Sequence, residues 1–162
     1  MHLPAALVLV AAHCLAAVTP DPPPDPLPDP APDDWRMQML ALINSARAAA
    51  DRPPLALDSR VNKLAQRHSE YQASIDQMTH DDPDGSLGDR ATRLGIRWSA
   101  LAENIAVGSR TVEETVDLWI DSPQHYANII GPFELVGFGR AANTSAQRET
   151  IYWTQEFVRP LA

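Results

Sequence analysis

The chain has 162 residues, of which 44% are hydrophobic and 6% aromatic, so it is long enough to bury the core of one domain. Its formal charge is −8, from 21 acids and 13 bases, and five of the acids precede Arg36, the first basic residue. This balance excludes the basic surface that a nucleic-acid-binding protein presents, and it gives no electrostatic attraction to anionic membranes.

An apolar run at the start of the chain indicates export. Residues 3–18 are apolar except for His13, and Cys14 and Ala16 stand where a signal-peptidase site needs small residues. The run is short for a membrane span. We therefore expect a signal peptide over residues 1–18, a secreted, extracellular or cell-envelope location, and no transmembrane segment in the mature chain. Cys14 is the only cysteine, so the mature domain makes no internal disulfide.

A proline-rich stretch follows the apolar run. Residues 19–34 place proline at about every second position, with aspartates between the prolines. Proline is incompatible with a helix interior or a central strand, and like charges extend the chain. We expect a Pro/Asp-rich linker here, either a spacer or an inert connection, and a folded domain over residues 35–160.

Apolar residues at helical spacing predict three helices in the first half of the domain. The first begins at an aspartate near residue 34 and ends before Arg52-Pro53-Pro54. The second is capped by Asp58 and continues to Ile75. The third covers residues 89–94 and stops at Gly95, a residue type that accepts the left-handed conformation of a helix end.

The stretch from residue 102 to residue 130 carries the most informative pattern. A capping box at residues 111–114 starts a helix near Val112, and Ser122-Pro123 ends it and begins a second, short helix. The carboxylate of Glu103 precedes these helices. Successive turns of the short helix carry His125, Asn128 and Ile129.

An alternating pattern replaces the helical one near the C-terminus. Residues 135–140 and 151–158 predict a hairpin whose strands are joined by the polar residues 142–150. Two strands alone are marginally stable, so we expect a third from the region around Trp98 or Leu55. The chain is therefore predicted to form an α+β domain.

Seven short motifs occur in order between residues 34 and 158. They are LINSAR at 42–47, AQRHS at 65–69, MTH at 78–80, AENIA at 102–106, WIDSPQHYANII at 119–130, VGFG at 136–139 and YWTQEF at 152–157. In this order they resemble the CAP superfamily of SCP-like extracellular proteins, in its disulfide-free bacterial type. The resemblance implies an α-β-α sandwich, in which a small antiparallel sheet is covered by helices on both faces.

The resemblance also implies a groove lined by two histidines and acidic residues. By position these are His80, Glu103 and His125. Animal members carry a second groove glutamate where this chain has Asp121 and Ser122, so the chain departs from their four-residue set.

The residue types themselves are consistent with a metal site. Two imidazoles and a carboxylate with an open position suit zinc or another divalent cation, and His80 and His125 are the expected ligands. The alternative is that these side chains form a buried hydrogen-bonded network that orders the loops. His68 lies on the apolar face of its helix, which favours a structural role, and Glu103 with Asn104 is also a pair that can fix a turn.

Three classes of function follow. The favoured one is a monomeric binding module whose groove takes a divalent metal, a small lipid, a sterol or a cell-wall ligand. The second is a metal-assisted hydrolase with Glu103 as general base and Ser69 or Ser122 as nucleophile, although Ser122 is better explained as a helix cap. The third is a structural surface domain without a ligand. The chain has no Gly-x-Ser-x-Gly or His-Glu-x-x-His motif, which favours binding over catalysis. His68, Asn128 and Ser122 form a second tier of expected site residues.

Overall fold

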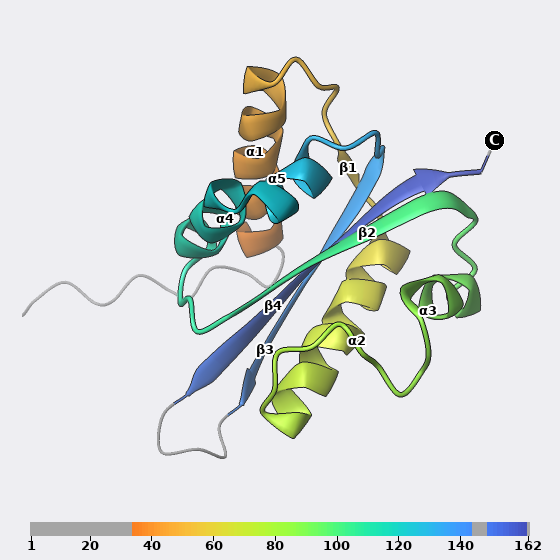
Figure 1. Ribbon diagram of the computed structural model, residues 1–162, viewed down its shortest axis with the longest axis vertical. Helices are drawn as coiled ribbons and strands as arrows, with labels where there is room; N and C mark the ends of the chain where they lie inside the picture. The colour runs from red at the N-terminus through yellow and green to blue at the C-terminus, as the bar shows by residue number, and fades with distance from the viewer. Residues whose placement is uncertain (1–33, 144–148, 162) are drawn as a thin grey trace, which may run out of the picture.

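A computed structural model describes residues 34–143 and 149–161, so the expected signal peptide and nearly all of the expected linker lie outside the described residues. Five helices and four strands follow one another along these residues (Figure 1). In chain order they are α1 (Asp34–Ala49), β1 (Ala56–Leu57), α2 (Ser59–Ile75), α3 (Leu87–Arg93), β2 (Trp98–Val107), α4 (Val112–Asp121), α5 (Pro123–Ile129), β3 (Leu135–Asn143) and β4 (Thr150–Pro160).

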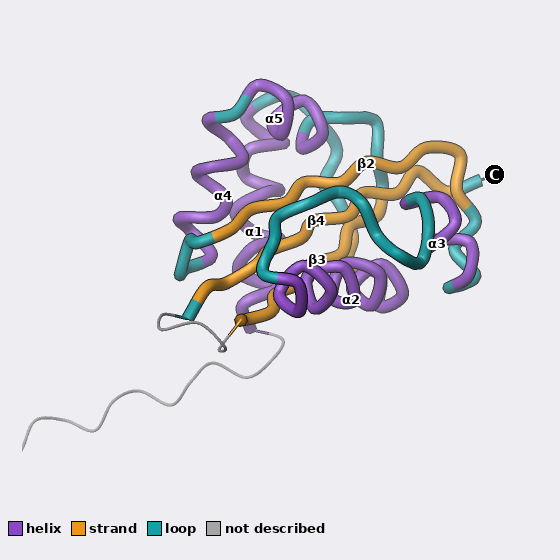
Figure 2. Tube along the Cα trace, turned by 60° about the horizontal axis from the view of Figure 1, so that its bottom comes forward, coloured by secondary structure: helices purple, strands orange, loops and turns teal. Residues whose placement is uncertain are grey.

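The four strands form one sheet in the order β1-β3-β4-β2. Helix α2 packs on β3 and β4 with α3 beside it, whereas α4 and α5 contact β2 and α1 packs on α4 and α5. Figure 2 shows α4 and α5 on one side of the sheet and α2 and α3 on the other, which confirms the expected α-β-α sandwich.

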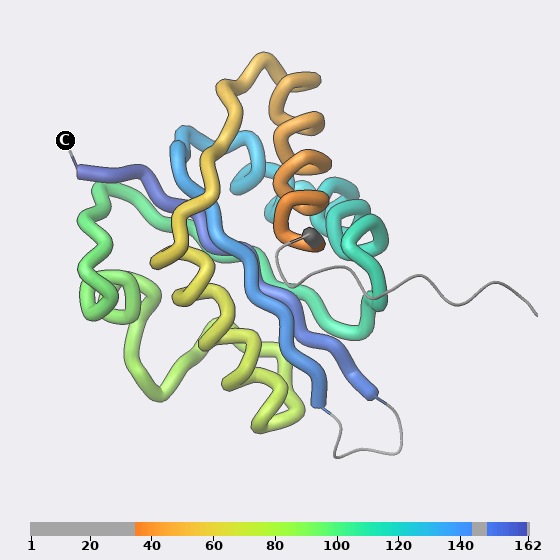
Figure 3. Tube along the Cα trace, turned by 180° about the vertical axis from the view of Figure 1, so that it is seen from behind, coloured from red at the N-terminus to blue at the C-terminus, as the bar shows by residue number. Residues whose placement is uncertain are grey.

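The sheet differs from the expectation in two details. Both regions that could supply a third strand do so, because Trp98 opens β2 and Leu55 immediately precedes β1. The short β1 runs parallel to β3, whereas the other two pairings are antiparallel. Figure 3 shows the segment between α1 and α2 passing along the β3 edge, where β1 joins the sheet. Glu103 and Asn104 lie inside β2, so the interpretation that they fix a turn is wrong.

Side chains fix most of the helix starts as predicted. Asp58 caps α2, and Thr111 with Glu114 forms the capping box of α4. Helix α3 begins at Leu87, two residues earlier than expected, because Ser86 and Asp89 form a second capping box. Ser122 occupies the cap position of α5, but its side chain makes no capping hydrogen bond, so only the position of that cap was predicted correctly.

Helix α2 lies unusually close to β3. A Cβ atom added to Gly137 would stand 2.1 Å from the carbonyl carbon of Val61, and one added to Gly139 would stand 2.2 Å from the carbonyl oxygen of Ala65. No other residue type fits at these two positions, which explains the glycines of the VGFG motif. The close approach brings the side chains of α2 directly onto β4 at the centre of the sheet.

The buried side chain of Arg47 connects α1 to α5. It is 1% exposed, and its guanidinium donates hydrogen bonds to the carbonyl oxygens of Pro53, Ile129, Gly131 and Phe133. These carbonyls include the C-terminal end of α5, where a cation is favoured by the helix dipole. Arg47 therefore fixes α5, and with it His125, relative to α1.

Candidate functional site

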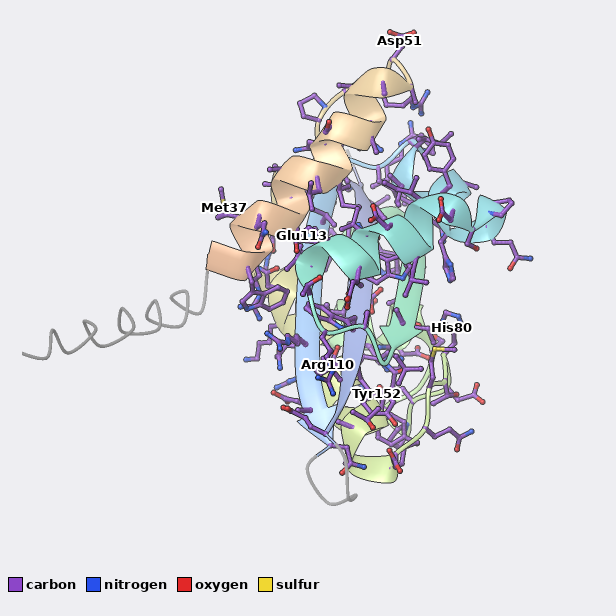
Figure 4. The ribbon with its side chains drawn as sticks, turned by 90° about the vertical axis from the view of Figure 1, so that its left-hand side faces the viewer. Met37, Asp51, His80, Arg110, Glu113 and Tyr152 are labelled. Atoms are coloured by element: carbon purple, nitrogen blue, oxygen red, sulfur yellow. The ribbon has the colours of Figure 1, made fainter. Side chains whose placement is uncertain are left out.

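His80 and Glu103 form the centre of the site. His80 lies on the loop between α2 and α3, which rises across the sheet to β2 (Figure 2). Its Nδ1 stands 2.7 Å from Oε1 of Glu103. The His80 side chain is 60% exposed and lies at the surface of the molecule (Figure 4), whereas that of Glu103 is 6% exposed. A buried carboxylate thus orients an exposed imidazole.

Glu103 is held from both of its oxygens. Its Oε2 accepts a hydrogen bond from Nη2 of Arg90 at 2.9 Å and lies 3.6 Å from Nε2 of His68. Burial alone would raise the pKa of Glu103, but hydrogen bonds with His80 and Glu156 and the positive charges of His68 and Arg90 outweigh burial and lower it to about 2. Glu103 is therefore ionised under all ordinary conditions.

Glu156 is a second carboxyl at the same place. It stands opposite Glu103 in the register of β2 and β4, and its side chain is 1% exposed. Burial and the neighbouring charge of Glu103 raise its pKa well above the usual range. Neither of its oxygens accepts a hydrogen bond from another described residue, and the protonated form of Glu156 can donate a hydrogen bond to Glu103.

His68 lies beneath the site as a satisfied buried histidine. Its Nδ1 is 2.8 Å from Oδ2 of Asp82, and its Nε2 donates to the carbonyl oxygen of Thr79 at 2.9 Å. Both of these partners lie on the loop that carries His80. His68 therefore fixes this loop on α2, and its distance from Glu103 makes it part of the network rather than an open ligand.

His125 comes to the site on α5. Nδ2 of Asn104 donates to the carbonyl oxygen of His125 at 3.2 Å and to Oε1 of Gln155 at 3.0 Å, and Nδ2 of Asn128 donates to Oδ1 of Asn104 at 2.8 Å. These amides tie α5 to β2 and β4. Burial and the charge of His80 lower the pKa of His125, so its ring is neutral when that of His80 still carries a proton. Its Nδ1 is buried without a hydrogen-bond partner.

The structure thus brings most of the expected residues together. His80 and His125 influence each other electrostatically, Glu103 contacts His80 and His68, and Asn128 supports α5. Ser122 stands apart, because no hydrogen bond joins its hydroxyl to another residue in the described part of the chain. We call His80, Glu103 and His125 the histidine site.

Three charged residues of the network were missed by the sequence analysis. Glu156 lies in the YWTQEF motif, but its partner on β2 becomes known only from the register of the strands. Arg90 is 6% exposed although it lies on a short polar helix, and Asp82 lies in a loop rich in aspartate. Only Glu156 carried a usable signal, since an acid inside an apolar strand must find a partner.

The donor set fits a cation only as an open, two-imidazole site. Glu103 accepts a hydrogen bond from Nδ1–H of His80, so the free lone pair of the neutral ring is on Nε2. In this arrangement a carboxylate orients a metal-binding histidine. Both oxygens of Glu103 are engaged, so it does not serve as a ligand itself. Within residues 34–143 and 149–161, no group of three or more His, Cys, Asp or Glu residues is arranged to hold a metal ion.

Comparison with known proteins identifies the family. The family model of the cysteine-rich secretory proteins, CAP, matches residues 40–157. The chain belongs to the CAP family. The matched residues contain no cysteine, because Cys14 precedes them, although the family is named for being rich in cysteine.

Individual relatives agree with the family assignment. The CAP domain is similar to the protein YkwD of Bacillus subtilis (strain 168), with 31% identity over 126 residues that cover 76% of this chain and 47% of that protein. The chain therefore spans about half the length of the curated relative that it matches. No helix among the described residues is long and apolar enough to cross a membrane.

Two solved structures share the fold. One is an extracellular protein from Bacillus anthracis that contains an SCP domain, with 27% identity, a TM-score of 0.66, and coverage of 80% of this chain and 44% of that one. The other is an outer surface protein of Borrelia burgdorferi, with 18% identity, a TM-score of 0.71, and coverage of 81% and 97%. These structural neighbours are an extracellular and a surface protein.

Proposed function

We propose that this CAP protein is an exported binding module whose histidine site takes a divalent cation. The observation that carries the proposal is the 2.7 Å contact between Nδ1 of His80 and Oε1 of Glu103, which leaves Nε2 of an exposed ring free. His125, with its lowered pKa, supplies a second imidazole in the neutral form that binds metals. Water or a bound ligand completes the coordination.

The geometry gives a hydrolase less support. A general base needs a pKa near the working pH, and the pKa of Glu103 is lowered to about 2. Of the two serines considered as nucleophiles, Ser69 is buried and donates to Thr154 Oγ1 at 2.9 Å, and Ser122 makes no hydrogen bond to His125 within the described chain. The network around Glu103 therefore supports orientation of a ligand rather than proton transfer.

A separate groove supports the binding of a lipid. A hollow of about 410 Å³ lies between α1 and the α4–α5 pair. Its walls are mostly apolar or small side chains, including Leu42, Ala46, Val116 and Ile120. Such a groove is suited to an acyl chain. We propose it as the lipid site, distinct from the histidine site, and the export of the protein would give it access to envelope lipids.

Thermal melting tests the cation proposal. The chain should be compared with the His80→Ala, His125→Ala and Glu103→Gln variants, each with chelator and with added zinc. Occupancy stabilises the folded state, so zinc should raise the melting temperature of the parent protein and fail to do so in either histidine variant. Since the His80 ring is exposed, His80→Ala should melt close to the parent in chelator.

The controls remove other sources of zinc binding. His2, His13 and Cys14 lie outside the described residues and should be alanine in every variant. Gln124→Ala, beside His125 on α5, should keep the zinc response. If zinc shifts none of the proteins and both histidine variants melt far below the parent in chelator, the site is a structural network and the cation proposal is wrong.

The lipid groove is tested by filling it. Ala46→Trp places a large ring among the lining residues, whereas Ala48→Trp places the same ring on an exposed position of α1 outside the lining. Binding of a fluorescent fatty acid should be lost in the first variant and kept in the second. Equal binding by both variants would contradict the proposed lipid site.

A further inference from the structure

A cavity lies between α2 and α3, away from the exposed ring of His80. Its volume is about 180 Å³, and the segment from Asp82 to Asp84 closes one side. Leu64 of α2, Leu94 at the end of α3, Pro83 and the ring of Tyr71 provide apolar walls. An engineered cavity of about 150 Å³ accepts benzene, so this one has room for a single ring or a short branched chain.

The polar part of the wall is rich in arginine. Arg67, Arg90 and Arg93 line the cavity together with Asp82 and Asp84. Asp84 lies 3.5 Å from Arg93, and Asp82 lies 3.7 Å from Arg90 and accepts from His68. Both acids therefore already have cationic partners. Three arginines against two aspartates leave the cavity wall with one excess positive charge, although the protein as a whole is acidic.

Several donors on this wall have no partner. Arg67 makes no ion pair or hydrogen bond within the described chain, and the Tyr71 hydroxyl also has none there. Arg90 is 6% exposed and already donates to Oε2 of Glu103 at 2.9 Å. The unpaired guanidinium of Arg67 beside the apolar walls of the cavity points to an acceptor that a ligand supplies.

We propose that this cavity is a second ligand site, which binds a small carboxylate with an apolar body such as an aromatic acid. The carboxylate is held by Arg67, with the Tyr71 hydroxyl as a further donor, because guanidinium and carboxylate groups match in shape and charge. The apolar body lies against Leu64, Leu94 and Pro83. The lining of this site does not include His80 or His125, although Arg90 also donates to Glu103, which contacts His80.

Benzoate is the probe for the test, with benzyl alcohol as its neutral counterpart and acetate as a carboxylate without the ring. The readout is the NMR signal of the Nε–H groups of Arg67 and Arg90 during titration at millimolar concentrations. Benzoate should shift both signals saturably and bind more tightly than either control compound. Loss of one charge-assisted hydrogen-bond partner should weaken binding about tenfold or more.

Two matched variants complete the experiment. Arg67→Gln removes the exposed cation that we assign to the carboxylate, and Lys63→Gln removes one from the same helix outside the cavity lining. Benzoate should bind more weakly to the first and unchanged to the second. The proposal is overturned if benzoate shifts neither arginine signal, if benzyl alcohol binds equally well, or if the two variants behave alike.

Discussion

Glu103 and Glu156 stand directly opposite each other in the register of β2 and β4, with both carboxyls buried next to Arg90. Two adjacent carboxylates in such a place cannot both be ionised, so the pKa of one falls and that of the other rises. Arg90, His68 and His80 all lower the pKa of Glu103 and so favour its ionised form. The pair therefore favours the state in which Glu103 is ionised and Glu156 is protonated.

Glu156→Gln tests this assignment, because the amide retains a donor toward Glu103 but does not titrate. The raised folded pKa of Glu156 means that its contribution to stability is complete below the ordinary value of 4.5 and is lost as the pH rises toward the folded pKa. The variant should gain stability relative to the parent by about 1 kcal/mol per pH unit over that range. Urea unfolding at several pH values measures the difference.

The exposed acid Glu134 provides the control for that series. Glu134→Gln should leave the pH dependence of stability nearly unchanged. A stability difference between Glu156→Gln and the parent that stays constant as the pH rises above 4.5 would show that Glu156 is ionised in the folded protein.

Glu103→Gln should lower the pKa of His80. The hydrogen bond with Glu103 is the main cause that raises this pKa, and partial burial of the ring opposes it. The His80–Glu103 pair contributes fully to stability between the ordinary glutamate value of 4.5 and the ordinary histidine value of 6.5. That contribution is lost as the pH falls from 4.5 toward the folded pKa of Glu103, which is about 2, or rises through the raised folded pKa of His80. An NMR titration of the His80 ring checks the shift, and an unchanged pKa would refute the contact.

Arg47→Met should destabilise the domain by about 3 kcal/mol or more, because hydrogen bonds from a charged group are lost and buried carbonyls are left without a donor. Urea unfolding measures the loss. Arg60, which is exposed and pairs with Asp58, is the matched control, and Arg60→Met should change stability little. Similar losses in the two variants would show that Arg47 does not organise α5.

Trp119→Ala should cost about 3 to 5 kcal/mol through the cavity that it leaves. The Trp119 side chain is 1% exposed, and its Nε1 donates to the carbonyl oxygen of Ile105 at 3.2 Å. Leu118, its neighbour on α4, is 52% exposed and should tolerate alanine. If unfolding shows a small loss for Trp119→Ala, the packing of α4 on β2 contributes less than the structure indicates.

The helices and the hairpin could be predicted because their signals are local. Asp58 and Thr111 mark helix starts through their own side chains. The alternation in residues 151–158 predicts a strand from that segment alone. The parallel pairing of Ala56 and Leu57 with β3 could not be predicted, since a two-residue strand has no period and its pairing depends on the whole sheet.

The site was only partly predictable for the same reason. His80, Glu103 and His125 lie in motifs that a family resemblance marks, but their positions are far apart in the chain. Arg90 and Glu156 enter the site through the packing of α3 and the register of β4, which no local pattern encodes. Burial of a charge is a property of the assembled domain, so the network around Glu103 became visible only in three dimensions.

The central claim is that His80 and His125 bind a cation together, and imidazole ¹⁵N NMR during a zinc titration tests it most directly. The chain should carry alanine at positions 2, 13 and 14 and be kept at a pH above the raised pKa of His80, as found by titration of its ring, where zinc competes less with protons. His68 is the internal control, because both of its ring nitrogens have partners. We predict that the Nε2 signal of His80 and a ring nitrogen of His125 shift together and saturate, whereas His68 does not respond. Unmoved signals from His80 and His125, or an equal response from all three histidines, would contradict the claim.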